Sequence, residues 1–480
     1  MTPQLAGLLL YSAGLVALGL WIGRRVHGTS DFFVAGRQLG PGLLFSTMLA
    51  ANIGAGSTIG AASLGYRDGL SAWWWVGSAG IGSIVLAFWV GPAIRRIAQA
   101  HDLRTVGDFL EWRFGADVRA IVTILLWFGT LAILAGQLIA VAWILNVVVG
   151  IPKWSGCLIG AVVMTAYFTA GGLLTSAWVN LVELVVLLAG FAVAFPIALH
   201  AAGGWPALTA AATAPPMFWH FTQGGGSGVV YLAMLGPAFI VSPGLLQKIY
   251  GARDDRAVRI GVGANAAVLL VFAFVPTLLG MMAQRLHPGL PANDLALPML
   301  LMHDMPAGVG SLALAALFSA EVSTADAILF MLSTSLSQDL YRRFIRPDAT
   351  DATVLRVARW AAVAGGAGGV LLALAAESVI GALTIFYTLL SVSLFVPILA
   401  GLYWRRAARV DALAALGIGV GCLLAVQAAT AGQGFGGLWT PALIGLIASC
   451  AGFLVAQAAR RPGAGEGTGA RPLGGSGYHS

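Results

Sequence analysis

The sequence predicts an all-α integral membrane protein. The chain of 480 residues is 59% hydrophobic and only 9% charged, whereas a soluble globular protein carries roughly 25% charged residues. Its apolar residues gather in runs of about twenty or more, the length that an α-helix needs to cross roughly 30 Å of hydrocarbon. Most of its basic residues lie between these runs. Together these observations predict a bundle of helices in a lipid bilayer.

About thirteen apolar runs are predicted to span the membrane. They lie at about 3–23, 40–65, 70–94, 118–149, 153–172, 175–200, 227–250, 257–283, 307–340, 354–376, 378–403, 410–430 and 438–458. An odd number of spans places the two ends of the chain on opposite sides of the membrane. The tail at 461–480 is rich in glycine and is predicted to be disordered.

The basic residues predict the orientation of the chain. If the N-terminus is outside, all 26 Lys and Arg residues except Arg67, Lys153 and Arg285 fall in cytoplasmic segments. Cytoplasmic loops of membrane proteins carry an excess of Lys and Arg. We therefore expect a multi-pass protein of the plasma (inner) membrane, with the C-terminus in the cytoplasm. The basic charge is a topology signal and predicts no nucleic-acid binding, because no single domain concentrates it.

Several functional classes lack their sequence signals. Cys157, Cys422 and Cys450 are scattered in apolar segments, with neither metal-ligand spacing nor a disulfide pattern. The chain has no P-loop for ATP and no zinc-type pair of histidines. We therefore expect no enzymatic activity. The run Trp73-Trp74-Trp75 predicts an aromatic belt at the outer membrane interface.

Two spans contain residues that interrupt helices. The run 40–65 holds Gly54, Gly56 and several Ser and Thr residues, and the run 227–250 holds Gly236-Pro237 and Pro243-Gly244. One interpretation is close helix packing through small residues. The other is a pair of discontinuous helices whose freed carbonyls line a binding site, as in secondary transporters. The two spans are five apart, which favours two inverted repeats of five helices.

Five motifs occur in order along the chain. They are "DFFVAGRQLGPG" (31–42), "AANIGAGSTIG" (50–60), "GYRDGLSAWWW" (65–75), "AGGLLTSAWVNLVE" (170–183) and "FSAEVSTADAILFMLSTSLSQDLY" (318–341). In this order they resemble the sodium/solute symporter family, whose members have the LeuT-type fold of two inverted five-helix repeats with discontinuous helices.

The resemblance implies a division of the chain. Residues 31–405 would form the transporter core of spans 2–11. Residues 1–30 would add an extra N-terminal span and loop, and residues 406–460 two C-terminal spans, followed by the cytoplasmic tail at 461–480.

The resemblance also implies a sodium site between the first broken helix and the ninth span. Its ligands would fall on Ala50, Ile53, Ala320, Ser323 and Thr324. The residue types agree, because Na⁺ prefers oxygen ligands and positions 320, 323 and 324 share one helix face. The alternative is that the two hydroxyls bond back to carbonyls of their own helix.

The chain departs from the family in the sixth span, where Asn180 and Glu183 replace the usual aspartate and glutamine. We hypothesise that Asp326, with Ser323 and Asn180, forms a second cation or proton site instead. The alternative is a neutral Asp326 that is hydrogen-bonded to Asn180 or a serine. Glu321 points roughly 100° away from Ala320 on the helical wheel and would be protonated, face water or pair elsewhere. We rank Asp326 above Glu321 and Glu183.

The solute is expected beside the broken helices, near the middle of the membrane. Candidate contact residues are Asn52, Ser57, Thr58, Gln137, Phe239, Ser242 and Tyr387. For Gln137 a helix–helix hydrogen bond is the alternative, and for Tyr387 ordinary packing. No basic residue is expected at this depth, which favours a small neutral, zwitterionic or monoanionic metabolite.

The leading hypothesis is a sodium-coupled secondary active transporter that imports a small polar organic solute by alternating access. Its partners would be Na⁺, the solute and the lipid bilayer, and a monomer would suffice for function. The alternatives are a proton-coupled symporter of the same fold and a transporter-like solute sensor.

Overall fold

The computed structural model describes residues 37–170, 173–209, 217–430, 432 and 434–460, with four isolated positions near the N-terminus. The side chains of 166–181, Ser319, Ser323 and Asp326 lie outside the described part. So do most of the predicted first span and all of the predicted tail. The described chain is nearly all helical, as the composition predicted. Its one hairpin pairs β1 (Gln223–Gly224) with β2 (Ser227–Gly228).

Ten helices in the described residues are long and apolar enough to cross a membrane. The prediction of thirteen spans is not confirmed. The first predicted span lies outside the described residues, and the apolar stretch described in α9 is shorter than a full span. Helical turns continue without interruption from the predicted span 40–65 into the predicted span 70–94, through the 3₁₀ segment Gly69–Ala72. Residues 56–100 therefore count as one of the ten helices, although the sequence predicted two spans there.

The first broken helix begins with α3 (Pro41–Asn52). Proline suits the first position of a helix, because the N–H that it lacks would have no acceptor within the helix there. The helix ends at Ile53, where φ is −103° and ψ is 89°. Helical turns resume as a π-helix at Gly56–Gly60 and continue as α4 (Ala61–Asp68). The interruption predicted from glycine, serine and threonine is confirmed.

The second broken helix consists of α12 (Tyr231–Val241) and α13 (Pro243–Tyr250). They meet at Ser242, whose ψ of 121° is not helical. Proline favours an extended conformation in the residue before it, which accounts for a break at this position. Pro237 lies inside α12 without ending it, so only one of the two predicted proline breaks occurs.

By their contacts the helices form two groups. In the first group α3, α4, α12 and α13 pack with α5 (Trp73–Val85), α14 (Asp255–Phe272) and α15 (Phe274–Leu286). In the second, α8 (Ala116–Val149), α9 (Lys153–Ala170), α17 (Ala307–Thr334) and α18 (Asp351–Ala375) pack together. α10 (Leu173–Ala201) contacts both α17 and α3, and α19 (Val379–Tyr403) contacts both α8 and α12. The broken helices therefore form the side of the first group that faces the second, where α3 and α13 contact α17.

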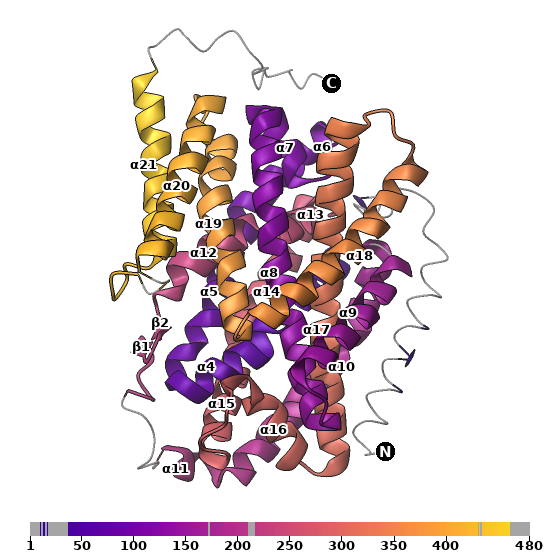
Figure 1. Ribbon diagram of the computed structural model, residues 1–480, viewed down its shortest axis with the longest axis vertical. Coiled ribbons are helices and arrows are strands. Elements are labelled where there is room, and N and C mark those ends of the chain that lie inside the picture. Colours follow the sequence, from indigo (N-terminus) through magenta and orange to yellow (C-terminus); the bar gives the residue numbers. More distant parts are fainter. Residues whose placement is uncertain are drawn as a thin grey trace.

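Shorter elements complete the structure. They are α6 (Gly91–Ala100), α7 (Val106–Phe114), α11 (Gly204–Thr209), α16 (Ala296–His303), the 3₁₀ turn Asn293–Leu295 and π-helical segments at Leu86–Val90 and Ser335–Ile345. α20 (Arg409–Ala429) and α21 (Pro441–Ala459) pack against each other at one side of the bundle (Figure 1).

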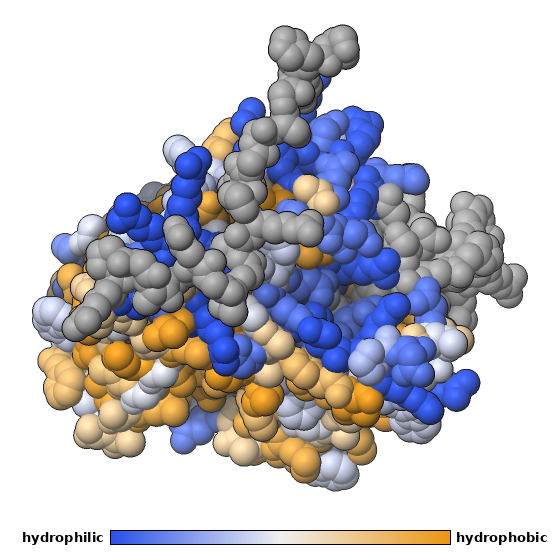
Figure 2. All heavy atoms as spheres, turned by 90° about the horizontal axis from the view of Figure 1, so that it is seen from above, coloured by the Kyte–Doolittle hydropathy of each residue, from blue (hydrophilic) through white to orange (hydrophobic). Residues whose placement is uncertain are grey.

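Basic residues that are far apart in the sequence meet at one end of the bundle. Arg113 of α7 donates to the carbonyls of Gly401 and Trp404 at the end of α19. Arg409 pairs with Asp117, and Arg460 pairs with Asp411. We call this end, which carries α6, α7 and the start of α20, the basic end. Figure 2 looks onto it and shows hydrophilic residues over the face and hydrophobic ones along the flank.

Candidate functional site

The first break meets α17 through one hydrogen bond. The hydroxyl of Thr324 donates to the carbonyl oxygen of Ala50 over 3.0 Å. In a continuous helix this carbonyl would accept from the N–H of Gly54, but that N–H donates to the Ser57 hydroxyl over 3.0 Å. The Ile53 carbonyl accepts no backbone hydrogen bond within the described part of the chain. The break thus leaves main-chain oxygens available opposite a threonine hydroxyl.

The structure brings part of the predicted sodium site together. Ala50 and Thr324 are in direct contact, and Ile53 and Ala320 are buried within about one helical turn of them. The side chain of Ser323 lies outside the described residues. The oxygens that are present are neutral dipoles, the ligand type that suits Na⁺. Among the described residues, no cluster of three or more His, Cys, Asp or Glu side chains offers a transition-metal site.

Two side chains satisfy the N–H groups that the break exposes. The N–H of Gly54 donates to Ser57, and the N–H of Ala55 donates to Oε1 of Gln137 over 2.9 Å. A buried backbone N–H without a partner is costly. Gln137 therefore supports the geometry of the break from α8, besides facing the cavity described below.

Glu321 is buried against the first broken helix. Its side chain is 0% exposed, and its Oε1 lies 2.8 Å from the Thr58 hydroxyl. The other oxygen, Oε2, has no hydrogen-bond partner in the described part of the chain. The sequence does indicate that Glu321 lies near Thr324, because residues three apart lie on neighbouring parts of one helix face.

The hypothesis of a second site at Asp326 cannot be followed in the structure. The side chains of Asp326, Ser323 and Asn180 lie outside the described residues. Glu183, three residues after Asn180, is buried with 2% exposure.

A small cavity lies between the two broken helices. Its volume is about 20 Å³, room for about one water molecule. Five predicted solute contacts line it: Asn52, Ser57, Gln137, Phe239 and Tyr387. Thr58 and Ser242 are not in the lining; Thr58 bonds to Glu321 and Ser242 forms the second break. The lining holds no charged side chain.

The prediction of an aromatic belt at the three tryptophans is wrong for Trp73 and Trp75. Both are buried, and Trp75 lines the cavity. Its ring centroid lies 6.0 Å from that of Tyr387, which lies 5.4 Å from that of Phe239. The three rings form one apolar wall. A run of tryptophans marks amphipathic surface in general, and the sequence does not show which rings face inward.

The basic end is closed by contacts from the segment just before α3. Arg37 donates to Oδ1 of Asp102 over 2.9 Å and to the carbonyl of Leu103 over 3.1 Å. It also reaches the carbonyl of Tyr250, the last residue of α13, over 3.3 Å. Leu39 adds backbone hydrogen bonds to Gly251 and from Arg253. The beginning of the first broken helix is therefore tied to the end of the second.

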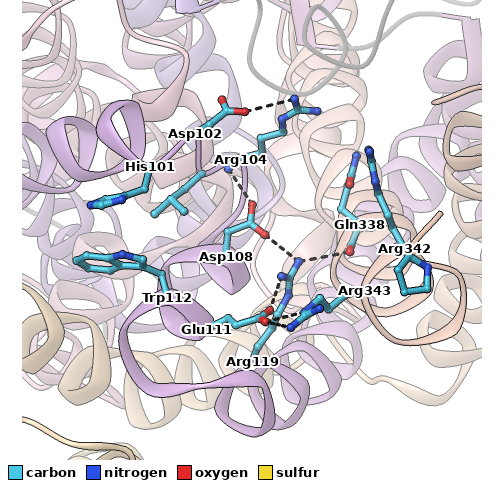
Figure 3. A pocket seen from close by; sticks show the side chains of 12 residues that line it. His101, Asp102, Arg104, Asp108, Glu111, Trp112, Arg119, Gln338, Arg342 and Arg343 are labelled. Atoms are coloured by element: carbon cyan, nitrogen blue, oxygen red, sulfur yellow. Dashed lines mark hydrogen bonds and ion pairs between the residues drawn. The ribbon is translucent and has the colours of Figure 1, made fainter. Parts of the chain in front are cut away.

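A separate cavity of about 520 Å³ opens at the basic end, as Figure 3 shows. Within its walls, Arg119 of α8 pairs with Asp108, Glu111 and Asp339 over 2.9, 2.8 and 2.6 Å. Glu111 also accepts from Arg343 over 2.6 Å. Burial acts to raise the pKa of Glu111, but the hydrogen bonds from Arg343 and Arg119 outweigh it, so the pKa is lowered. These pairs join α7, α8 and the segment after α17.

Comparison with known proteins identifies the family. The sequence model of the sodium:solute symporter family matches residues 32–419. The chain belongs to this family. It is 28% identical to the sodium/pantothenate symporter of Escherichia coli over 459 residues, covering 90% of this chain and 91% of that protein. It is 24% identical to the high-affinity proline transporter of Bacillus subtilis, covering 85% and 89% of the two chains.

The fold of this family member also has a solved counterpart. A Na⁺-coupled sialic acid symporter in a substrate-bound, outward-open state matches with a TM-score of 0.81 and 18% identity, over 96% of this chain and 98% of that one. The predicted LeuT-type fold is therefore confirmed. The chain is a multi-pass membrane protein of a transporter family and not an enzyme.

Proposed function

We propose that the protein is a sodium-coupled secondary active transporter that imports a small polar organic solute by alternating access. The contact between the Thr324 hydroxyl and the Ala50 carbonyl carries this proposal. It joins the first broken helix to α17 through two oxygens of the kind that Na⁺ requires. Transporters of this type place their coupling ions where unwound backbone carbonyls face a neighbouring helix.

The coupling ion would be held by the carbonyls of Ala50, Ile53 and Ala320 and the hydroxyls of Ser323 and Thr324. All five are neutral, so the site would bind Na⁺ weakly enough to release it to the cytoplasm. Inward movement of one Na⁺ contributes about 2.3 kcal/mol per 100 mV of membrane potential. Asp326 and Asn180 remain our candidates for a second cation or proton site.

The solute would enter where the small cavity now lies. Asn52, Ser57 and Gln137 offer hydrogen bonds on one side, and Phe239 and Tyr387 offer aromatic surface on the other. The absence of charge in this lining favours a neutral, zwitterionic or monoanionic solute, because a polyanion would lack a cationic partner. At about 20 Å³ the cavity is closed around water-sized space, so solute binding requires the surrounding helices to move apart. Thr58 and Ser242, which do not line it now, are candidates for contact in that open state.

The proposed orientation places the basic end in the cytoplasm of a cell enclosed by the plasma (inner) membrane. The N-terminus would then be outside and the C-terminus inside. The contacts of Arg37 and the pairs around Arg119 would close the cytoplasmic side in the present conformation. The cavity and the proposed ion site lie within one chain, so a monomer would suffice for transport.

A direct test is solute uptake into proteoliposomes under an imposed Na⁺ gradient. Pantothenate, proline and sialic acid, the solutes named for the similar proteins, are the first to try. We expect uptake of one small polar solute that depends on inward Na⁺ and is abolished when K⁺ replaces Na⁺. Uptake driven equally by a proton gradient without Na⁺ would instead favour a proton-coupled symporter, a candidate that the buried carboxylate of Glu321 supports.

A further inference from the structure

The cavity at the basic end has room for a ligand. Its volume of about 520 Å³ is within the range of roughly 300–1,000 Å³ that is usual for binding pockets. It shares no lining residue with the small cavity between the broken helices. Its lining comes from α7 and the loop before it, the start of α8 and the segment after α17 (Figure 3). Four arginines and three carboxylates are part of this lining: Arg104, Arg119, Arg342 and Arg343, and Asp102, Asp108 and Glu111.

The carboxylates of this lining already have partners. Oδ2 of Asp108 accepts two backbone N–H groups just before α7, over 2.8 and 3.0 Å, and its Oδ1 pairs with Arg119 over 2.9 Å. Glu111 accepts from Arg119 with one oxygen and from Arg343 with the other. Asp102 is 72% exposed, so water reaches it. The wall therefore offers few acceptors that a ligand would have to satisfy.

Two arginines keep N–H groups that the described part of the chain does not use. An arginine has five N–H donors in a fixed fork. Arg342 makes one contact, over 3.5 Å to Asp351, and Arg343 bonds Glu111 through Nε and Nη2. Carboxylates outside the lining balance much of the positive charge. The unused N–H groups, rather than an excess of charge, therefore indicate a ligand that brings acceptor oxygens.

A buried amide in the same wall also lacks an acceptor. Gln338 is 8% exposed, and its Nε2 has no hydrogen-bond partner in the described part of the chain. Leaving a buried donor unpaired is costly. Gln338, Arg342 and Arg343 all belong to the segment Ser335–Ile345. Phosphate and carboxylate oxygens match the arginine fork and could satisfy these donors together.

The surface beside these donors indicates the source of the acceptor oxygens. Phe344 and Ile345 directly follow Arg343, and they are 46% and 71% exposed. They are the last residues of the candidate membrane span that begins at Ala307. Exposed apolar side chains at the end of a span meet the edge of the hydrocarbon, and lipid head groups lie just beyond it. A phospholipid can therefore place its chains on Phe344 and Ile345 and its phosphate among the arginines.

We propose that the cavity at the basic end binds the phosphate group of an anionic phospholipid. Basic pockets between membrane helices bind lipid head groups in this way. An anionic lipid fits better than a zwitterionic one, because a choline head group brings its own cation next to the arginines. The bound lipid would join α7, α8 and the segment after α17, and would stabilise the pairs around Arg119. The proposal goes beyond transport and is independent of the coupling ion and the solute.

The experiment measures lipid binding to the purified, full-length protein in a neutral detergent by native mass spectrometry. Phosphatidylglycerol is the anionic probe and phosphatidylcholine the zwitterionic one. We expect the wild type to bind phosphatidylglycerol about tenfold more tightly or better. Glycerol 1-phosphate is then added as a soluble competitor. It should displace little phosphatidylglycerol, because it lacks the chains that would contact Phe344 and Ile345.

Three arginine variants test the position of the site. Arg342→Gln removes the guanidinium with the most unused donors and should raise the Kd for phosphatidylglycerol about fivefold. Arg342→Lys keeps the charge and should retain most of the binding. Arg256→Gln is the matched control: it removes an exposed arginine at the start of α14 that does not line the cavity, so it should bind as the wild type does.

Gln338→Met tests the site without a change of charge. It deletes a buried donor that has no partner in the described part of the chain, so the melting temperature without added lipid should not fall. The affinity for phosphatidylglycerol should fall nonetheless. A purely structural role for Gln338 would give the opposite result, a lower melting temperature with unchanged affinity.

The unfavourable outcomes are distinct. Equal affinities of the wild type for the two lipids, or equal Kd values in Arg342→Gln and Arg256→Gln, would overturn the proposal. Displacement of phosphatidylglycerol by a similar concentration of glycerol 1-phosphate would overturn the lipid as the source of the phosphate. If Arg342→Gln does not fold, an unchanged affinity in Gln338→Met would overturn the site. A failure of sodium-driven uptake would count against the proposed function and would leave this proposal standing.

Discussion

The Thr324 hydroxyl donates to the Ala50 carbonyl although the two residues are 274 positions apart in the sequence. Each belongs to a different helical group, so this one bond joins the first broken helix to the second group of helices. Both partners are buried. The oxygens that would bind Na⁺ are thus shared between two parts of the molecule that would move relative to each other in the proposed alternating access.

Thr324→Ala is expected to remove the response to sodium. The substitution deletes one proposed ligand and the donor to Ala50. Purified wild-type protein should unfold at a higher temperature in NaCl than in KCl at equal ionic strength. The gain in the free energy of unfolding should be up to about RT ln(1 + [Na⁺]/Kd). The variant should unfold at the same temperature in both salts. Thr324→Ser keeps the hydroxyl and should retain most of the difference; a normal sodium response in Thr324→Ala would contradict the site.

Gly54→Ala is expected to separate the break from α17. The added methyl would lie 2.5 Å from Cβ of Thr324 as well as 2.3 Å from its Oγ1. Overpacking of this kind costs roughly 1–3 kcal/mol, and here it pushes apart the groups proposed to bind Na⁺. We expect a lower melting temperature and sodium affinity reduced about tenfold or more.

Gly42→Ala is the matched control for this change. Gly42 lies in α3, the helix that leads into the break at Gly54, and a Cβ there would meet nothing within 4 Å. Alanine is the better helix former by about 1 kcal/mol, so this variant should be at least as stable as the wild type and should bind sodium normally. Equal sodium affinity in Gly54→Ala and Gly42→Ala would show that the close approach at Gly54 is irrelevant to the ion.

The breaks could be predicted because they depend on local chemistry. Gly54, Ser57 and Pro243 disfavour a continuous helix wherever they occur in an apolar run, and the structure breaks beside all three. The proline at 237 shows the limit of this argument, because neighbouring helices keep its segment helical. Local propensity names the positions at which a break is possible, and packing decides which of them are used.

Glu321 could not be placed from the sequence because its partner lies on another helix. A helical wheel fixes angles within α17, but the contact with Thr58 depends on the depth and rotation of the first broken helix against α17. The same holds for Gln137, whose bond to the N–H of Ala55 depends on how α8 lies against the break. Trp75 also needed the packing of α12 and α19 before it could be assigned to the cavity wall.

Asp294 is expected to make stability fall as pH rises. Burial raises its pKa, although the N–H of Val379 donates to it over 3.0 Å. A carboxyl group whose pKa is higher in the folded state destabilises the fold as pH rises from its unfolded pKa, about 3.9, through its folded one. Asp294→Asn keeps an acceptor for Val379 without the charge, so its melting temperature should depend less on pH over this range.

Asp294→Ala distinguishes the charge from the hydrogen bond. It leaves the buried N–H of Val379 at the start of α19 without its acceptor, which costs roughly 1–3 kcal/mol. Its melting temperature should therefore be lower than that of Asp294→Asn at every pH. If both variants melt alike, the bond to Val379 contributes nothing measurable.

Arg119 and Asp339 are expected to be strongly coupled. Their side chains are only 6% and 7% exposed, and the guanidinium lies 2.6 Å from the carboxylate. Removing one partner of such a pair leaves a buried charge and costs about 3–5 kcal/mol. Arg119→Met and Asp339→Asn should each lower the melting temperature, and the double variant should be less destabilised than the sum of the two. Asp108 and Glu111 also contact Arg119, so Arg119→Met should be the more damaging single change. If the two single destabilisations simply add in this double-mutant cycle, the two side chains do not stabilise each other. The pair would then not hold the basic end closed.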